Sequence, residues 1–388
     1  MIKIKSDKII TENGLFDGYV YIQNDRIHSI SKDNHDSDYF YDYTGKYLSP
    51  GFIDIHTHGA GGFSFSKSNS EDIIKACEFH LMHGTTTILP TISSLPFKKI
   101  KSSVINIAKA IESKKCKANI IGAHIEGPYF SLNQCGAQFP DYITAPIKED
   151  YEPLINEYGK YIKRWSYAPE RDIDGEFCRF LVEKGIISSA GHTDAKYEDM
   201  KIAINNGCNL VTHLYSCTST VTRNKGYRDL GVIETAFLRD ELYVEIIADG
   251  KHMPPELINM IIKIKGIDKV ALVTDSMSIV GTNAVEGVGD GTEYIVEDGV
   301  CKLKDRSAFC GSIATSDRLV KVLVKDCGQS IIDAVKMITK VPSKIFKLNK
   351  GEIAVGKDAD LIVFDDDINI SDVFVNGKNS DIKKEGFL

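Results

Sequence analysis

Eight short apolar segments alternate with helical stretches across the middle of the chain, and this alternation is the strongest constraint on its fold. The apolar segments have the length of buried strands and cover residues 51–56, 85–92, 119–126, 162–169, 185–191, 208–214, 243–249 and 269–275. Helical periodicity appears between many of them, at residues 70–83, 97–111, 176–184, 195–206 and 255–264. About eight strand–helix units predict an α/β fold with a parallel (β/α)8 barrel.

The two ends of the chain have a different pattern, in which short strand candidates are separated by turns. Neither end could bury a core alone, whereas the two together could. We therefore predict a small β-sandwich domain formed from residues 1–50 and 346–388, and a barrel domain formed from residues 51–345.

Composition excludes several classes of protein. The chain has 388 residues, of which 43% are hydrophobic and 26% charged, as in a globular protein with a large core. Its net charge of −7 argues against a nucleic-acid partner, and no apolar run reaches membrane-spanning length or forms a signal peptide. The nine cysteines include no CxxC pair, so we predict reduced thiols and a cytoplasmic location.

Six of the ten histidines lie at the C-terminal ends of the predicted strands, where barrel enzymes carry their catalytic groups. These are His56, His58, His124, His192, His213 and His252. Glu126 and Asp275 occupy equivalent places. Because side chains two apart on a strand share a face, His56 points with His58, and His124 points with Glu126. Imidazoles and carboxylates that converge from separate strands predict a divalent metal site.

These residue types also suggest a reaction. Glu126, His192 and His213 form a three-ligand set that leaves a position for water, and His56 and His58 could complete a second metal position with a bridging carboxylate. Water on such a cation has a pKa of about 7 and supplies a hydroxide nucleophile. Asp275 is placed to take a proton from that water and return it to a leaving group. The set predicts metal-assisted hydrolysis, most naturally of a C–N bond.

Several motifs carry a resemblance that runs over nearly the whole chain. They are PGFIDIHTHG (50–59), HIEGPYF (124–130), AGHTDA (190–195), THLYS (212–216), IADGKH (247–252), LVTDSM (272–277) and CGS (310–312). In these motifs the chain resembles the amidohydrolase superfamily, and within it the deacetylases of N-acetylglucosamine 6-phosphate. The resemblance implies Glu126, His192 and His213 as metal ligands and Asp275 as the acid/base.

The resemblance has further implications for cofactors and partners. Members with HxH at the first strand bind two metals, so His56 and His58 imply a second cation. We expect one or two divalent ions per subunit (Zn, Fe, Mn or Co), since mixed His/Glu sites accept all four. In this family the histidine of ADGxH and an arginine hold the substrate phosphate across a dimer interface. His252 matches that histidine, and a homodimer is implied.

Three departures from the family pattern affect the substrate contacts. Gln138 stands where members have a histidine that polarises the acyl carbonyl, and glutamine can donate a hydrogen bond but cannot be cationic. Ser216 and Cys217 replace an Asn-Ala pair that touches substrate. The phosphate arginine falls on an asparagine, with Arg223 and Arg228 nearby. The complete set of expected substrate residues is Gln138, Ser216, Cys217, Arg223, Arg228, His252, Cys310 and Gly311.

The expected activity is therefore removal of acetate from N-acetylglucosamine 6-phosphate to give glucosamine 6-phosphate. N-acetylgalactosamine 6-phosphate or another N-acyl amino sugar is an alternative substrate. A different amidohydrolase activity, such as N-acyl amino acid deacylation, is a further alternative. A metal-binding protein without catalysis is the least favoured reading, because it would not need Asp275. We also predict that the glycine-rich stretch 281–291 is a loop near the mouth of the site.

Overall fold

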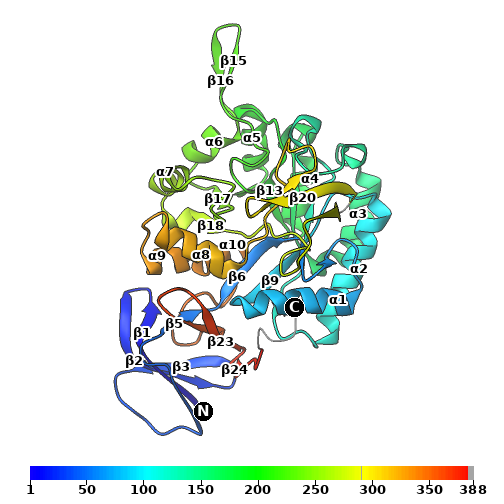
Figure 1. Cartoon of the computed structure of the whole chain (residues 1–388). Helices are drawn as coiled ribbons and strands as arrows, with labels where there is room; N and C mark the ends of the chain where they lie inside the picture. The colour runs from blue at the N-terminus through cyan, green and yellow to red at the C-terminus, as the bar shows by residue number, and fades with distance from the viewer. Residues whose placement is uncertain (290, 383–388) are drawn as a thin grey trace.

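The middle of the chain forms a barrel of eight parallel strands in the computed structural model, which describes residues 1–289 and 291–382 (Figure 1). The barrel strands are β6 (Phe52–Thr57), β9 (Thr85–Ile92), β11 (Ala123–Glu126), β12 (Ile162–Tyr167), β13 (Ile187–Ala190), β14 (Leu210–Val211), β17 (Tyr243–Ile246) and β18 (Val270–Leu272), and β10 (Asn119–Ile120) adds to β9. Neighbours in this order pair in parallel. The predicted barrel is confirmed.

Closure of the barrel occurs beside the predicted metal site. The main-chain N–H of Asp275 donates to the carbonyl of His56 at 2.9 Å, and the N–H of His58 donates to the carbonyl of Ser276 at 2.8 Å. These bonds join the first strand to the segment that follows the last. The closing seam therefore brings His56, His58 and Asp275 to one place.

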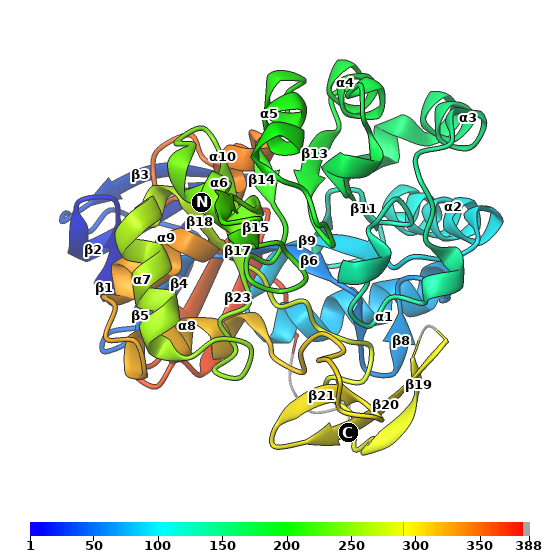
Figure 2. The same ribbon diagram turned by 90° about the horizontal axis from the view of Figure 1, so that it is seen from above.

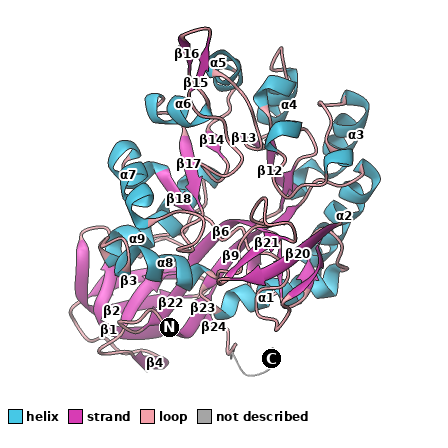
Figure 3. Ribbon diagram, turned by 45° about the horizontal axis from the view of Figure 1, so that its top comes forward, coloured by secondary structure: helices cyan, strands magenta, loops and turns pink. Residues whose placement is uncertain are grey.

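Helices surround the barrel strands on the outside (Figures 2 and 3). They are α1 (Ser70–Met82), α2 (Phe97–Ser113), α3 (Lys148–Tyr158), α4 (Glu176–Glu183), α5 (Tyr197–Asn205), α6 (Val232–Leu238), α7 (Pro255–Lys265), α8 (Ser316–Lys325), α9 (Ile331–Ile338) and α10 (Lys340–Phe346). The five predicted helices correspond to α1, α2, α4, α5 and α7. No helix that the structure describes combines the length and apolar character needed to cross a membrane.

Strands from both ends of the chain form a second sheet beneath the barrel in Figure 1. They are β1 (Ile2–Thr11), β2 (Gly14–Gln23), β3 (Arg26–Ser31), β4 (Tyr39–Asp42), β5 (Tyr47–Pro50), β22 (Leu361–Phe364), β23 (Ile370–Val375) and β24 (Lys378–Asn379). The two ends join where β22 runs antiparallel to β5. Residues from both ends share a separate core that includes Ile4, Val20, Leu48, Leu361 and Phe374.

This arrangement confirms the prediction of a small β domain built from both ends of the chain. The boundaries that we place between residues 50 and 51 and between residues 345 and 346 stay a prediction, and residues 383–388 lie outside the described part of the chain.

Three smaller strand groups lie outside the barrel sheet and the terminal sheet. A hairpin of β15 (Thr222–Asn224) and β16 (Tyr227–Asp229) projects away from the barrel in Figure 1. A three-stranded sheet of β19 (Glu286–Gly289), β20 (Thr292–Glu297) and β21 (Val300–Leu303) lies at one side of the barrel in Figure 2. A short hairpin joins β7 (Gly59–Ala60) and β8 (Phe63–Ser64).

The prediction that residues 281–291 form a loop is wrong for part of that stretch. Residues Glu286–Gly289 form β19, which pairs antiparallel with β20. Glycines weaken the strand pattern in the sequence, and pairing with β20 supplies the hydrogen bonds that local preference does not. Asp290, within the same stretch, lies outside the described residues.

A buried histidine of α1 supports the turn that follows His58. Nε2 of His80 lies 2.9 Å from the carbonyl oxygen of Gly59, which can only accept, so Nε2 carries the proton. Nδ1 of His80 is buried without a hydrogen-bond partner among the described residues. Burial lowers the pKa of His80 to about 4, because a second proton would have to sit on this unpartnered nitrogen.

We expect acid to destabilise the fold through His80. The unfolded chain binds a proton near pH 6.5 and the folded chain only near pH 4, so stability is lost as pH falls between these values. The free energy of unfolding should fall by about 3 kcal/mol across this pH range. The free energy of unfolding should be measured against pH for wild type and His80→Gln, which keeps a donor but does not titrate. Parallel curves for the two proteins would contradict the assignment.

Candidate metal centre

The carboxylate of Glu126 lies at the centre of the candidate site, between four imidazoles. Its Oε1 is 3.1 Å from Nε2 of His56, 3.1 Å from Nε2 of His213 and 3.4 Å from Nε2 of His192. Its Oε2 is 3.2 Å from Nε2 of His58. The structure thus brings together all five residues that the sequence predicts as metal ligands, and it places the carboxylate where it can bridge two positions.

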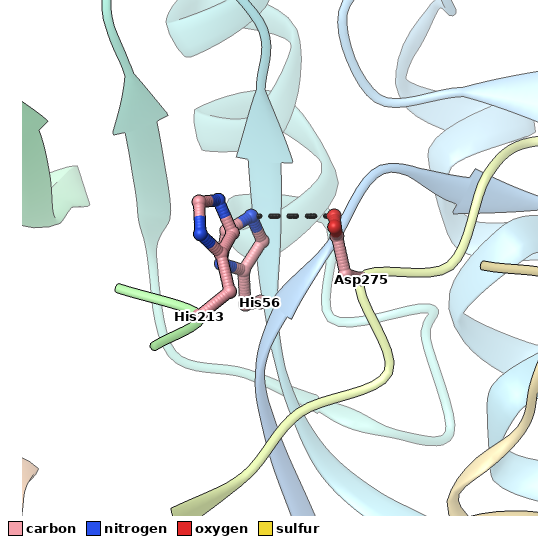
Figure 4. A group of neighbouring side chains, drawn as sticks. All are labelled: His56, His213 and Asp275. Carbon is pink, nitrogen blue, oxygen red and sulfur yellow. Dashed lines mark ion pairs between the residues drawn. The ribbon is translucent and has the colours of Figure 1, made fainter. Parts of the chain in front are cut away.

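Asp275 faces the same cluster from the segment after β18. Its Oδ1 lies 3.1 Å from Nε2 of His58. The same oxygen lies 3.5 Å from Nε2 of His56, and Figure 4 draws this ion pair. Three groups of potential ligand atoms lie within 4.8 Å of one another: Glu126 with His192 and His213, Glu126 with His56 and His58, and Asp275 with His56 and His213. Asp275 therefore lies beside the position that His56 and His58 could form.

Hydrogen bonds behind two of the imidazoles fix which nitrogen is free. Nδ1 of His192 is 2.9 Å from the carbonyl oxygen of Gln134, and Nδ1 of His213 is 2.9 Å from the carbonyl oxygen of Ser216. Because a carbonyl oxygen only accepts, each Nδ1 carries the proton and donates. When each ring is neutral, the lone pair is on Nε2, the nitrogen that faces Glu126.

The donor set fits a divalent cation. Nε2 of His56 is fully buried and forms no hydrogen bond among the described residues, although Oε1 of Glu126 is 3.1 Å away. A buried polar atom without a partner is costly, and a coordinated cation would satisfy it. Imidazole nitrogens and carboxylate oxygens are also the ligands that Zn and related ions prefer.

The backbone at the site is held in an uncommon conformation. His192, His213 and Asp275 have φ values of 47°, 26° and 46°, in the left-handed region that side-chain-bearing residues rarely adopt. Each such residue costs of order 1–3 kcal/mol and persists only where the surrounding structure imposes it. All three lie two or three residues past the end of a barrel strand. His192 and His213 face Glu126, and Asp275 faces His56 and His58.

The charges in the site compensate one another when no cation is considered. Burial alone would lower the pKa of His56 and His58, but Glu126 and Asp275 outweigh it and raise these pKa values to about 9 and about 10. Burial would likewise raise the pKa of Asp275, but His56 and His58 lower it to about 2. Asp275 is therefore ionised at neutral pH, as a proton acceptor must be.

His124 lies below this cluster rather than in it. Its Nδ1 is 3.1 Å from Oγ1 of Thr91 and its Nε2 is 2.7 Å from Oγ of Ser166, so both ring nitrogens are occupied. Burial and the nearby Arg164 guanidinium hold its pKa well below the usual range. His124 is thus a neutral residue that packs against the ring of His56, with 4.7 Å between ring centroids.

A cavity of about 360 Å³ opens onto the cluster, within the size range of small-molecule sites. The predicted substrate residues that line it are Gln138, Ser216, Cys217, His252, Cys310 and Gly311. The cavity is also lined by five residues of the cluster, which are His58, Glu126, His192, His213 and Asp275. Its remaining walls include Phe139, Tyr215, Met277 and Phe309, so the pocket combines polar and apolar surfaces.

Gln138 is held between two fixed groups. The main-chain N–H of Ser94 donates to its Oε1 at 2.9 Å, so its Nε2 points at Glu126 and donates to Oε2 at 2.8 Å. The loop that carries Gln138 approaches the site closely at Gly136, where an added Cβ would lie 2.5 Å from Sγ of Cys217. In this conformation the amide group contacts Glu126 and is not free to turn toward another acceptor.

His252 is oriented by its own loop. Its Nδ1 lies 2.9 Å from Oδ2 of Asp249, and its ring packs against Phe309 with 4.8 Å between centroids. Nε2 is the remaining polar atom of the ring, in a side chain that lines the pocket. Since Nδ1 carries the proton that the carboxylate accepts, Nε2 faces the ligand as an acceptor in the neutral ring and as a donor in the imidazolium.

Arg223 and Arg228 are the two predicted substrate residues that the structure separates from this pocket. They face each other across the β15–β16 hairpin, both are exposed, and neither lines the cavity. Tyr227 of the same hairpin is 79% exposed.

Sequence reasoning missed two buried residues beneath the site. Arg164 and Glu245 form an ion pair inside the barrel, and Oε2 of Glu245 lies 3.4 Å from Nδ1 of His56. The signal was present, because each is a charged residue inside a segment predicted to be a buried strand, where charges are rare unless paired.

Comparison with known proteins agrees with this geometry. The sequence model of the amidohydrolase family matches residues 47–383. The N-acetylglucosamine-6-phosphate deacetylase of Bacillus subtilis (strain 168) is 30% identical over 392 residues, with 98% of each chain covered. An N-acetylgalactosamine-6-phosphate deacetylase of Shewanella sp. (strain ANA-3) is 29% identical over 342 residues, which cover 87% of this chain and 84% of that protein.

A solved structure with bound substrate is also similar. It is an aspartate-to-alanine mutant of N-acetyl-D-glucosamine-6-phosphate deacetylase from Mycobacterium smegmatis in complex with N-acetyl-D-glucosamine-6-phosphate. It superposes with a TM-score of 0.90 at 25% identity and covers 97% of this chain and 98% of that chain.

Cation binding should release protons from His56 and His58. Both imidazoles are protonated at pH 7 in the cation-free site, and a ligand nitrogen must lose its proton, so filling this position releases about two protons. Calorimetric titration with Zn²⁺ in buffers of different ionisation enthalpy measures this number. His56→Asn/His58→Asn should release about two fewer protons, and equal release by the two proteins would contradict the prediction.

Proposed function

The chain belongs to the amidohydrolase family, and on that basis we propose that it is a metal-dependent deacetylase of a phosphorylated N-acetyl amino sugar. N-acetylglucosamine 6-phosphate is the proposed substrate, and acetate and glucosamine 6-phosphate are the products. The observation that carries the proposal is the convergence of four imidazoles on Glu126, with Asp275 beside His56 and His58, next to a pocket that Glu126 and Asp275 line. Similarity to deacetylases of this substrate supports the choice of sugar.

We assign the cation positions from the ligand geometry. Glu126, His192 and His213 would hold one divalent ion, and His56 and His58, with Glu126, would hold a second. Such an ion polarises the acyl oxygen and lowers the pKa of water. Zn, Fe, Mn and Co all suit this donor set, and one or two ions per subunit are proposed.

Asp275 moves the proton. It is ionised at neutral pH, so it can accept a proton from the attacking water as the new C–O bond forms. It then donates that proton to the amide nitrogen, and the C–N bond breaks to release a neutral amine and acetic acid, which then ionises to acetate. The same carboxyl thus acts as base and then as acid, as its place between the cluster and the open pocket allows.

The other pocket residues bind and orient the sugar. His252, as an imidazolium, is the proposed donor to the phosphate through Nε2, since Asp249 accepts from Nδ1 and orients the ring. Ser216 and Cys217 line one wall, and Cys310 and Gly311 line another. Gln138 donates a 2.8 Å hydrogen bond to Glu126. It could donate to the acyl oxygen of the substrate only by giving up that bond.

N-acetylgalactosamine 6-phosphate is the second candidate substrate. The chain is 29% identical to a deacetylase of that sugar, close to its identity with the deacetylases of the glucose epimer. Ser216, Cys217 and Gln138 also differ from the expected pattern at the places where the sugar would contact the protein.

We further propose a cytoplasmic homodimer. All nine cysteines are free thiols, as a reducing compartment would maintain. The β15–β16 hairpin projects from the barrel, and a two-stranded hairpin alone is only marginally stable in water. A partner subunit would cover it, and its arginines would then supply cationic groups to the partner's pocket rather than to their own.

Acetate release should be seen with N-acetylglucosamine 6-phosphate, and Asp275→Asn should reduce kcat by at least about 10²-fold, since proton transfer contributes 10²–10⁴-fold. Acetate is assayed with this sugar, its galactose epimer and the unphosphorylated sugar. Metal content serves as the control, because Asp275→Asn should leave Glu126, His192 and His213 in place. Full activity of Asp275→Asn would contradict the mechanism, and no turnover of any amino sugar would contradict the substrate assignment.

Mixed dimers test the hairpin. Arg223→Ala/Arg228→Ala and Asp275→Asn should each be nearly inactive at low substrate concentration. Mixing and reannealing them should restore about a quarter of wild-type activity, because one pocket of each mixed dimer combines an intact Asp275 with the intact hairpin of its partner. Absence of any restoration, in a sample shown by mass spectrometry to contain mixed dimers, would mean that the hairpin does not serve the partner.

A further inference from the structure

An ion pair occupies the barrel interior directly below the metal cluster. Arg164 of β12 and Glu245 of β17 are both fully buried, with Nη1 against Oε1 and Nη2 2.8 Å from Oε2. Barrel interiors are ordinarily filled by Val, Ile and Leu. A buried ion pair often adds no stability over apolar residues of similar size, because two charges must leave water. Stability is therefore a poor explanation for this pair.

The pair contacts the residues that carry both cation positions. Oε2 of Glu245 lies 3.4 Å from Nδ1 of His56 and accepts from the main-chain N–H of His213 at 3.3 Å. Arg164 donates to the carbonyl of Ile55 at 3.2 Å and to Oγ1 of Thr212 at 2.9 Å. Ile55 and Thr212 immediately precede His56 and His213, so the pair braces both ligands from below.

His56 differs from the other three imidazoles in what lies behind it. In His192 and in His213, the ring nitrogen Nδ1 faces a main-chain carbonyl oxygen. Nδ1 of His58 lies 3.1 Å from the hydroxyl of Ser93. Only His56, among these four, has a carboxylate there. A carboxylate that accepts the Nδ1 proton makes Nε2 a stronger metal ligand and fixes the plane of the ring.

We propose that Glu245, neutralised by Arg164, is a positioning residue that orients His56 and thereby controls occupancy of the second cation position. The inference rests on the proposed function only in taking His56 as a metal ligand. Loss of a group that supports a ligand in this way weakens metal binding by about 10–100-fold. The first position, formed by Glu126, His192 and His213, does not use His56 and keeps its ion.

The test is the number of Zn²⁺ ions bound per chain, with Zn²⁺ titrated into metal-free protein and retained metal measured by mass spectrometry. Wild type should bind two ions. Glu245→Gln keeps the size of the side chain and loses its charge, and it should bind one ion as wild type does and the second about 10–100-fold more weakly. Equal binding of both ions by this variant, or only one ion in wild type, would overturn the proposal.

A double variant separates positioning from folding. Arg164→Met/Glu245→Leu replaces both charges by apolar groups, which in other proteins is often neutral or stabilising. The double variant should unfold at a temperature no lower than that of Glu245→Gln, and it should still bind the second ion more weakly than wild type does. Recovery of normal binding in the double variant would mean that the unpaired Arg164, and not the loss of Glu245, caused the defect.

A second buried ion pair provides the matched control. Lys350 and Asp360 are 7% and 3% exposed and lie 2.5 Å apart, and Asp360 also accepts from Asn119 of β10, away from the cluster. Asp360→Asn should lower stability and leave both ions bound. If the wild-type enzyme failed to hydrolyse any amino sugar, the ion counts would still decide this inference, so the two proposals can fail independently.

Discussion

Glu126 imposes the main physical constraint on this molecule, because its buried carboxylate lies within 3.4 Å of four imidazole nitrogens. Burying a carboxylate is unfavourable unless cations or donors surround it. The barrel meets this requirement by ending several strands at one point, with His192, His213 and Asp275 in left-handed backbone conformations. The strain at these three residues is a cost of directing side chains from separate strands toward a single atom pair.

The same requirement extends one layer deeper into the barrel. An imidazole ring that faces Glu126 must also be fixed in its orientation. Each Nδ1 in the cluster has a polar group behind it that can do so. Arg164 and Glu245 take space that apolar side chains would otherwise fill. The barrel thus has a polar layer below the site. A separate apolar cluster includes Leu89, Leu210, Ile247 and Ala271, and the larger apolar core includes residues of the strands and the surrounding helices.

Sequence could predict the strands and the clustering of the candidate ligands, because both depend on local pattern. A strand has period two, so the spacing of His56 with His58 and of His124 with Glu126 fixes shared faces, and a parallel barrel puts every strand end on one rim. It could not predict that Gln138 would bond to Glu126, because the loop is placed by contacts distant in sequence. The sequence did not predict the pairing of β19 with β20, because glycines interrupt the strand pattern there.

The chemistry and the substrate recognition rest on different kinds of structure. Glu126 and the histidines sit on or directly after barrel strands, whereas Gln138, Ser216, Cys217 and the β15–β16 hairpin lie in connections between them. Loops can change without disturbing the barrel beneath them. Every departure from the expected family pattern falls in this second group. Under the proposed function, the strands would therefore set the bond that is broken, and residues that the barrel does not constrain would choose between epimeric sugars.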